Sequence, residues 1–247
     1  MTDSFAPCGV IPVYNHEHAV GRVLAAVRAA GLPCLLVDDG SDAPCARELE
    51  RLAASTPQTQ LLRLAPNRGK GCAMIAGFRA AAARGYTHAL QVDADAQHAL
   101  GDIPRFVAEA RAYPQALICG RPLFDASMPR ARRYGRYLTH ALVWLDTLSF
   151  SIPDSLCGFR VYPLGPVVHL AAEEHIGARM EFDVEILVRL YWRRLSLRWI
   201  PTRVTYPLDG VSHFRMLRDN ARMVALQARL VFGMLLRLPQ LLRRKLA

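Results

Sequence analysis

Two carboxylates separated by one residue close an apolar segment in the first half of the chain. The run THALQVDADAQH (87–98) contains Asp93 and Asp95, with Gln97 and His98 directly behind them. In an extended backbone, side chains two residues apart point to the same side, so both carboxylates can share one divalent cation. Hard oxygen ligands suit Mg²⁺ or Mn²⁺, which commonly join carboxylates to phosphates. The alternative is a strand-end turn whose acids cap the next helix, but Gln97 and His98 favour the metal interpretation.

Polar residues also follow two earlier apolar runs. Tyr14 and Asn15 come after IPV, and Asp38 and Asp39 end CLLVDD just before Gly40. A carboxylate in such a place can accept hydrogen bonds from a ribose or from a base N–H. For the second pair, an ordinary Asp-Gly turn is the alternative.

The segment PNRGKG (66–71) brings Arg68, Lys70 and two glycines to the start of a predicted helix. Backbone N–H groups at a helix start favour anions, so the segment predicts either an anion cradle or a simple capped helix start. It is not a P-loop, because Gly71 follows Lys70 directly.

Two later segments are charged. Residues 121–136 contain arginines that could grip a phosphate or form a solvated basic surface, namely Arg121, Arg130, Arg132, Arg133 and Arg136. The run DSLCGFR (154–160) puts Asp154 and Arg160 on either side of an apolar turn, and these residue types alone indicate no chemistry.

The elements that must position these residues alternate in the first 120 residues. We expect strands at 8–13, 34–39, 60–65, 88–95 and 116–120, with helices near 17–30, 43–54, 69–84 and 101–112. This alternation predicts an α/β fold with a mostly parallel sheet. Ligands of such sheets bind beyond the carboxyl ends of the strands, where the polar residues above fall.

The second half predicts fewer strands. We expect a helix at 134–150, a strand at 157–164, a helix at 182–194 and an extended segment at 198–208. Residues 214–246 predict an amphipathic helical tail, kinked or split near Pro239. The tail either lies on anionic lipid or packs on its own domain, and its many arginines favour lipid.

Charge is distributed unevenly. Residues 1–120 hold 11 basic and 11 acidic residues, so the net charge of +10 lies entirely in the second half. That excess suggests an anionic partner, although nothing in the sequence is a nucleic-acid recognition motif. The six cysteines show no metal-binding spacing and indicate free thiols in a reducing cytosol. We expect neither a signal peptide nor a transmembrane span.

Taken together, eight stretches in order resemble the family 2 glycosyltransferases, and most closely their dolichol-phosphate mannosyltransferase-like branch, which has the GT-A fold. The stretches are IPVYN (11–15), VDDGS (37–41), NRGKGCAMIAG (67–77), VDADAQH (92–98), CGR (119–121), DSLCGFRVY (154–162), MEFDVEILVR (180–189) and GVSHF (210–214). The resemblance implies a GT-A domain over 1–212, with a nucleotide-sugar half (1–120) and an acceptor half (121–212). A basic tail, 213–247, would follow.

The resemblance also implies an inverting transfer from a nucleotide-diphosphate sugar to a lipid-linked acceptor such as a polyprenyl phosphate. The implied nucleotide-binding residues are Pro12, Tyr14, Asn15, Glu17, Asp38, Asp39, Lys70, Asp93 and Ala94. Asp93, Asp95 and Gln97 would hold Mg²⁺ or Mn²⁺, and Asp95, Asp154 and Arg160 would be catalytic. The acceptor would contact Arg121, Arg130, Arg132, Arg133 and His213. The expected location is the inner face of the cytoplasmic membrane, with the protein cytoplasmic and peripherally bound to its anionic surface.

The identity of the acceptor remains open at this point. A phosphate acceptor is already anionic and needs no general base, whereas a hydroxyl acceptor on a lipid-like metabolite needs one, for which Asp154 is the candidate. A non-catalytic protein that binds nucleotide sugars is a further alternative. The sequence departs from the family where His16 precedes Glu17 and where His213 replaces an expected cation.

Overall fold

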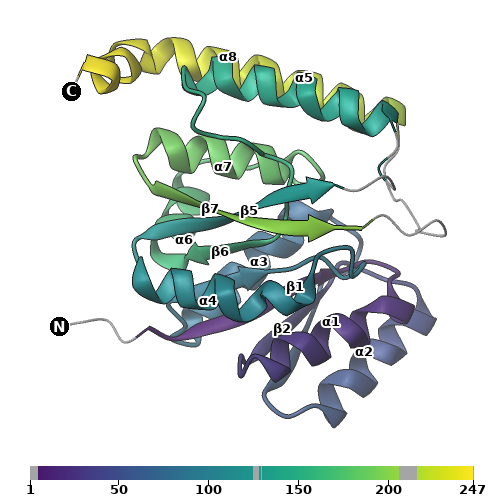
Figure 1. Ribbon diagram of the computed structural model, residues 1–247. Helices are drawn as coiled ribbons and strands as arrows, with labels where there is room; N and C mark the ends of the chain where they lie inside the picture. Colours follow the sequence, from purple (N-terminus) through teal and green to yellow (C-terminus); the bar gives the residue numbers. More distant parts are fainter. Residues whose placement is uncertain (1–4, 125–127, 129, 206–215, 247) are drawn as a thin grey trace.

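The computed structural model of this chain describes residues 5–124, 128, 130–205 and 216–246. Its centre is a seven-stranded sheet with the strand order β3-β2-β1-β4-β6-β5-β7 (Figure 1). The strands are β1 (Pro7–Val13), β2 (Cys34–Asp38), β3 (Thr59–Arg63), β4 (His88–Gln91), β5 (Ala116–Phe124), β6 (Arg160–Pro163) and β7 (Ser196–Val204).

All strands except β6 run in the same direction. Strand β6 is antiparallel to both of its neighbours, β4 and β5. The carboxyl ends of the other six strands therefore meet at one edge of the sheet, where ligands of α/β proteins bind. The predicted α/β class with a mostly parallel sheet is confirmed.

Helices cover both faces of the sheet (Figure 1). They are α1 (Glu17–Ala29), α2 (Ala43–Ser55), α3 (Lys70–Ala83), α4 (Ile103–Ala112), α5 (Arg130–Thr147), α6 (Leu164–Glu173), α7 (Phe182–Trp192) and α8 (Met216–Leu246), with a short 3₁₀ turn, η1 (Leu100–Asp102), before α4. Helices α1, α2 and α4 pack on one face, whereas α3, α6 and α7 pack on the other. Burial on both faces explains why β2 and β4 are continuously buried instead of alternating.

Helices α5 and α8 lie side by side as an outer layer on α7 (Figure 1). Leu226, Leu230, Met234 and Leu241 bury one face of α8. Buried Asp146, near the end of α5, accepts hydrogen bonds from Gln227 of α8 at 2.9 and 3.0 Å. The tail therefore packs on its own domain.

The structure differs from the sequence prediction in two elements. Residues 164–173 form helix α6, although a strand was expected to run to residue 164. The segment contains Gly165 and Pro166, which weaken a helical pattern, but Pro166 lies in the first turn, where a missing N–H costs little. Helix α8 continues through Pro239 as one element instead of splitting there. Strand β6 is antiparallel, a direction that its sequence does not encode.

All six cysteines are unpaired, as expected. No helix within the described residues is both long and apolar enough to cross a membrane.

Candidate active site

The acidic loop after β4 is fixed to the end of β7. Strand β4 ends at Gln91, and Asp93 and Asp95 follow in the turn beyond it. The Ala99 N–H donates to the carbonyl of Arg203 at 3.1 Å, and the Thr205 N–H donates to the carbonyl of Gln97 at 3.0 Å. Two long-range backbone hydrogen bonds thus hold the loop at the carboxyl edge of the sheet.

Lys70 lies between two carboxylates. Its ammonium is 2.8 Å from Asp93 and 2.7 Å from Asp183, at the start of α7. Burial alone would raise the pKa of Asp93, but the charge of Lys70 and the nearby His98 outweigh it and lower that pKa. Asp93 is therefore held as a carboxylate, and His98 Nε2 lies 3.7 Å from it.

The Asp95 carboxylate has fewer stabilising contacts than the Asp93 carboxylate. Its carboxylate accepts one hydrogen bond, from the Gln97 N–H at 3.1 Å. Burial and then the negative charge of Asp93 raise the pKa of Asp95. A cation beside both carboxylates would remove this repulsion.

The turn at Gly158 packs directly against this cluster. A Cβ atom at Gly158 would lie 2.7 Å from Asp93 Oδ2 and 2.9 Å from both Lys70 Nζ and Gln91 Nε2. The run DSLCGFR, uninformative from residue types alone, therefore forms one wall of the acidic cluster.

Arg160 is buried beneath the cluster and does not reach solvent. It donates to the Tyr162 hydroxyl at 3.2 Å and to the carbonyls of Asp183 and Ser155, each at 2.8 Å. All of these acceptors are protein groups. The predicted catalytic role of Arg160 has no geometric support, and its contacts favour a positioning role.

Asp38, the last residue of β2, and Asp39, directly after it, are also buried. Asp39 accepts hydrogen bonds from the N–H groups of Arg68 and Gly69 at 2.8 and 2.7 Å, and from the Asn67 amide at 2.9 Å. It thereby ties the 66–69 loop to the sheet just before α3. Asp38 accepts the Ser41 N–H at 2.8 Å.

The remaining predicted nucleotide-binding residues lie at the same edge. Asn15 exchanges two hydrogen bonds with Asp42, at 2.9 and 3.1 Å, and so joins the loops after β1 and β2. Pro12, Tyr14 and Glu17 are half-buried around it, and Ala94 is buried between the two acids of the metal candidate.

Asp154 is saturated with hydrogen bonds. Arg136 of α5 contacts both of its carboxylate oxygens, at 2.6 and 2.7 Å, and His140 Nε2 lies at 3.2 Å. The N–H groups of Leu156 and Cys157 also donate to it. Burial raises the pKa of Asp154, but the His140 hydrogen bond and the Arg136 charge prevail and lower it to about 2. Such a carboxylate is a poor general base.

The predicted acceptor residues are only partly visible. Arg121 of β5 and Arg133 of α5 are exposed. The side chains of Arg130 and Arg132, and all of His213, lie outside the described residues.

Sequence reasoning missed the partners that organise the cluster. Asp183 is 113 residues from Lys70, and Arg136 is 18 residues from Asp154. The only earlier signals were that Asp183 lies in the family-like stretch MEFDVEILVR and that Arg136 belongs to the arginine-rich segment.

Comparison with known proteins agrees with this geometry. The family model described as "Glycosyl transferase family 2" matches residues 8–164, which include the acidic loop and β6. The chain belongs to glycosyl transferase family 2. This family 2 member is therefore a glycosyltransferase, and the interpretation as a non-catalytic binding protein is set aside.

Its relatives act on lipid phosphates, according to their names. The family 2 chain is 33% identical to the undecaprenyl-phosphate mannosyltransferase of Micrococcus luteus, over 80% of this chain and 82% of that protein. It is 26% identical to the polyprenol monophosphomannose synthase of Mycolicibacterium smegmatis, over 86% of this chain and 82% of the relative. These similarities support the dolichol-phosphate mannosyltransferase-like branch.

A solved structure has the same fold. The glucosyl-3-phosphoglycerate synthase of Mycobacterium tuberculosis, in complex with Mn²⁺ and UDP-glucose, superposes with a TM-score of 0.65 at 14% identity. The match covers 94% of this chain and 78% of the synthase. It confirms that the family 2 chain has the GT-A fold.

Proposed function

We propose that this glycosyltransferase moves a sugar, with inversion, from a nucleotide-diphosphate sugar to a polyprenyl phosphate. The observation that carries the choice of acceptor is the state of Asp154. With a pKa of about 2 and four hydrogen-bonding partners, this carboxylate is unsuited to deprotonating a hydroxyl. A phosphate oxygen needs no such base, and the relatives named above are polyprenyl-phosphate transferases.

The donor site is proposed at the carboxyl edge of the sheet. Asp38, Asp39 and the Tyr14–Asn15 loop would surround the nucleoside, with Pro12, Glu17 and Ala94 lining its walls. The solved synthase of the same fold binds UDP-glucose, which supports a nucleotide-sugar donor for this chain. Lys70 would lie beside the diphosphate at the first turn of α3, where the backbone N–H groups of the helix start favour an anion.

The residues present fit a divalent cation. The described residues contain no group of three His, Cys, Asp or Glu side chains that could hold a metal by themselves. Asp93 and Asp95, with Gln97, would therefore share the cation with donor oxygens, as Mg²⁺ and Mn²⁺ commonly do. Such an ion supplies charge neutralisation for the leaving diphosphate. Burial and the negative charge of Asp93 raise the pKa of Asp95, so a bound cation would stabilise the charged form of this carboxylate.

The chain's own residues would divide the remaining work. Gln91 donates to Asp183 at 2.9 Å, and Asp183 in turn pairs with Lys70. These contacts would fix the Lys70 ammonium, which orients Asp93. Arg121, Arg130, Arg132 and Arg133, with His213, would bind the acceptor phosphate. The division into a nucleotide half (1–120), an acceptor half (121–212) and a tail (213–247) remains part of this proposal.

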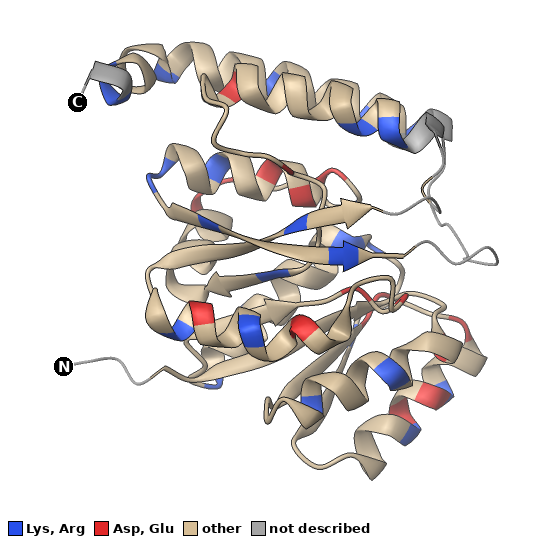
Figure 2. Ribbon diagram, viewed as in Figure 1, with Lys and Arg blue, Asp and Glu red and all other residues tan. Residues whose placement is uncertain are grey.

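The outer helices are proposed to rest on an anionic membrane. On α8, Phe232, Leu235, Leu236 and Pro239 are exposed on the face opposite its buried leucines. Exposed Tyr134, Tyr137, Leu138 and Leu145 form a similar stripe on α5. Among charged positions of these two helices, basic residues predominate (Figure 2). Apolar stripes flanked by arginine fit the anionic inner face of the cytoplasmic membrane.

A thermal-shift screen of nucleotide-diphosphate sugars tests the donor site. The matching donor should raise the melting temperature by several degrees with Mn²⁺ and less without it. Asp95→Ala should remove the Mn²⁺-dependent part, whereas Asp102→Ala, an acid outside the cluster, should retain it. A Mn²⁺-dependent shift that survives in Asp95→Ala would contradict the proposed metal site.

A further inference from the structure

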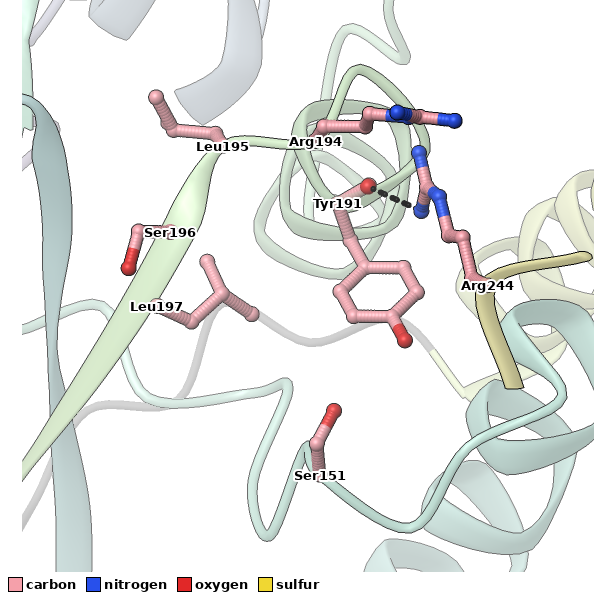
Figure 3. A pocket seen from close by; sticks show the side chains of 7 residues that line it. All are labelled: Ser151, Tyr191, Arg194, Leu195, Ser196, Leu197 and Arg244. Atoms are coloured by element: carbon pink, nitrogen blue, oxygen red, sulfur yellow. Dashed lines mark hydrogen bonds between the residues drawn. The ribbon is translucent and has the colours of Figure 1, made fainter. Parts of the chain in front are cut away.

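A separate pocket lies at the edge of the sheet opposite the acidic cluster. It has a volume of about 380 Å³ and is open to solvent on one side. Its walls come from the end of α7, the first residues of β7, the loop at Ser151 and the end of α8 (Figure 3). The lining residues are Ser151, Tyr191, Arg194, Leu195, Ser196, Leu197 and Arg244.

Arg244 is fixed at the wall of this pocket. Its guanidinium donates to the carbonyls of Tyr191 and Trp192 at 3.1 and 2.7 Å, which are the last carbonyls of α7. Its Nε atom is buried and has no hydrogen-bond partner within the described part of the chain. A buried donor without an acceptor costs free energy.

A second guanidinium stands beside the first. Arg194 is exposed and lies next to Arg244 in the pocket (Figure 3). Burial and then the positive charge of Arg194 lower the pKa of Arg244. Within the described ranges, no carboxylate forms an ion pair with either arginine. Two adjacent guanidiniums without a carboxylate partner are complementary to an oxyanion with several acceptor oxygens.

The surroundings favour an oxyanion that carries an apolar body. The pocket mixes the hydroxyls of Ser151 and Ser196 with the side chains of Leu195 and Leu197. Phe150, adjacent to Ser151, is 82% exposed although it is aromatic. The exposed apolar stripe of α8 extends to Leu242, two residues before Arg244. A phospholipid has both parts, a phosphate and acyl chains.

We propose that this pocket binds the phosphate of an anionic phospholipid headgroup and fixes the carboxyl-terminal end of α8 on the bilayer. The inference rests on the proposed membrane location and adds a specific lipid site to it. Arg194 and Arg244 bind the phosphate oxygens, and Phe150 enters the acyl region. The enzyme is thereby anchored at the edge of the sheet away from the acidic cluster.

Vesicle co-sedimentation tests this site with the full chain, without sugar donor or polyprenyl phosphate. Wild type, Arg194→Gln and Arg243→Gln are compared on phosphatidylcholine vesicles with and without phosphatidylglycerol. Arg243 is exposed on the same helix end but does not line the pocket, so the two variants lose equal charge. Loss of one basic residue near an anionic surface weakens binding about fivefold. Arg194→Gln should weaken it about tenfold beyond the Arg243→Gln effect, and Arg194→Lys should only partly restore binding.

Each other outcome overturns a defined part. Equal losses in Arg194→Gln and Arg243→Gln would show that general surface charge binds the vesicles, and the pocket site would be wrong. Inorganic phosphate could raise the melting temperature of wild type while both variants lose vesicle binding equally. That combination would assign the pocket to a soluble anion and would contradict the proposed phospholipid site. If phosphatidylglycerol does not increase the vesicle binding of wild type, the proposed membrane location is wrong as well. Sugar transfer plays no part in any of these measurements.

Discussion

At the residue scale, Lys70 explains how two adjacent acids are tolerated. Its ammonium lies 2.8 Å from Asp93 and 2.7 Å from Asp183, so Asp93 is neutralised by the protein itself. Among the residues that the structure describes, Asp95 has one N–H donor and no comparable cationic partner. The pair is therefore asymmetric, and the site has a deficit of positive charge at Asp95. A divalent cation bound together with the donor diphosphate would place positive charge where the protein lacks it.

Asp154 distinguishes a structural acid from a catalytic base. Asp154→Asn should leave the Arg136 guanidinium without its charged partner, and loss of a buried partner costs about 3 kcal/mol or more. The melting temperature should fall by about 6–12 °C. The turnover number, measured well below the melting temperature, should fall less than about tenfold. A loss of about 100-fold or more with an unchanged melting temperature would identify Asp154 as the base instead.

Gly158 is required for space beside Asp93 and Lys70. Gly158→Ala should displace those two side-chain ends, since the new Cβ would lie 2.7 Å from Asp93 Oδ2. We expect donor affinity in the presence of Mn²⁺, measured by calorimetry, to fall at least about tenfold. Gly165→Ala, in α6, is the matched control, because its Cβ meets nothing within 4 Å. Equal donor affinity in both variants would show that the 157–159 turn does not shape the site.

At the scale of elements, α5 connects the active-site edge to the outer layer. Arg136 and His140 hold the loop before β6, and Asp146 near the end of the same helix binds Gln227 of α8. Trp192 of α7 donates to the Asp146 carbonyl at 2.9 Å. One helix therefore fixes both an active-site loop and the docking of the tail.

The docking of α8 should depend on pH through Asp146. Burial raises the pKa of Asp146 to about 6, although the Gln227 hydrogen bond opposes the rise. An unfolded carboxyl titrates near about 4, so the folded chain binds more protons between about pH 4 and 6. Stability contributed by neutral Asp146 is thus lost as the pH rises through this window.

Asp146→Asn cannot titrate and should remove this dependence. Thermal melts should show the variant gaining about 5 °C relative to wild type between about pH 4.5 and pH 8. Asp219→Asn, at another acid of the same outer layer, controls for general charge effects. A difference between Asp146→Asn and wild type that is the same at both pH values would contradict the raised pKa.

At the scale of the whole molecule, local patterns predicted the sheet and the acidic loop. Apolar runs bounded by turns located the strands β1 to β5, and Asp93 and Asp95 were identified from their spacing. Contacts between distant residues were not predictable in this way. The Lys70–Asp183 pair spans 113 residues, and the side-chain partners of Asp154 come from a helix whose packing no local pattern encodes.

The burial of individual side chains was also not predictable from sequence patterns. Arg160 resembled a catalytic cation because it lies in a family-like stretch, but only the three-dimensional structure shows that it is enclosed. The antiparallel β6 brings that stretch between β4 and β5, next to the acidic cluster. Arg121 of β5 and Arg133 of α5 remain exposed, where the proposed acceptor phosphate would approach.

Direct detection of the glycolipid product tests the proposed reaction most decisively. Purified enzyme is incubated with labelled nucleotide-diphosphate sugars, Mn²⁺ and either a polyprenyl phosphate or the corresponding polyprenol, and label is counted in the organic phase. We predict transfer to the phosphate alone, Mn²⁺-dependent and abolished in Asp95→Ala. Transfer to the polyprenol hydroxyl, or no lipid product from any donor, would contradict the proposed function.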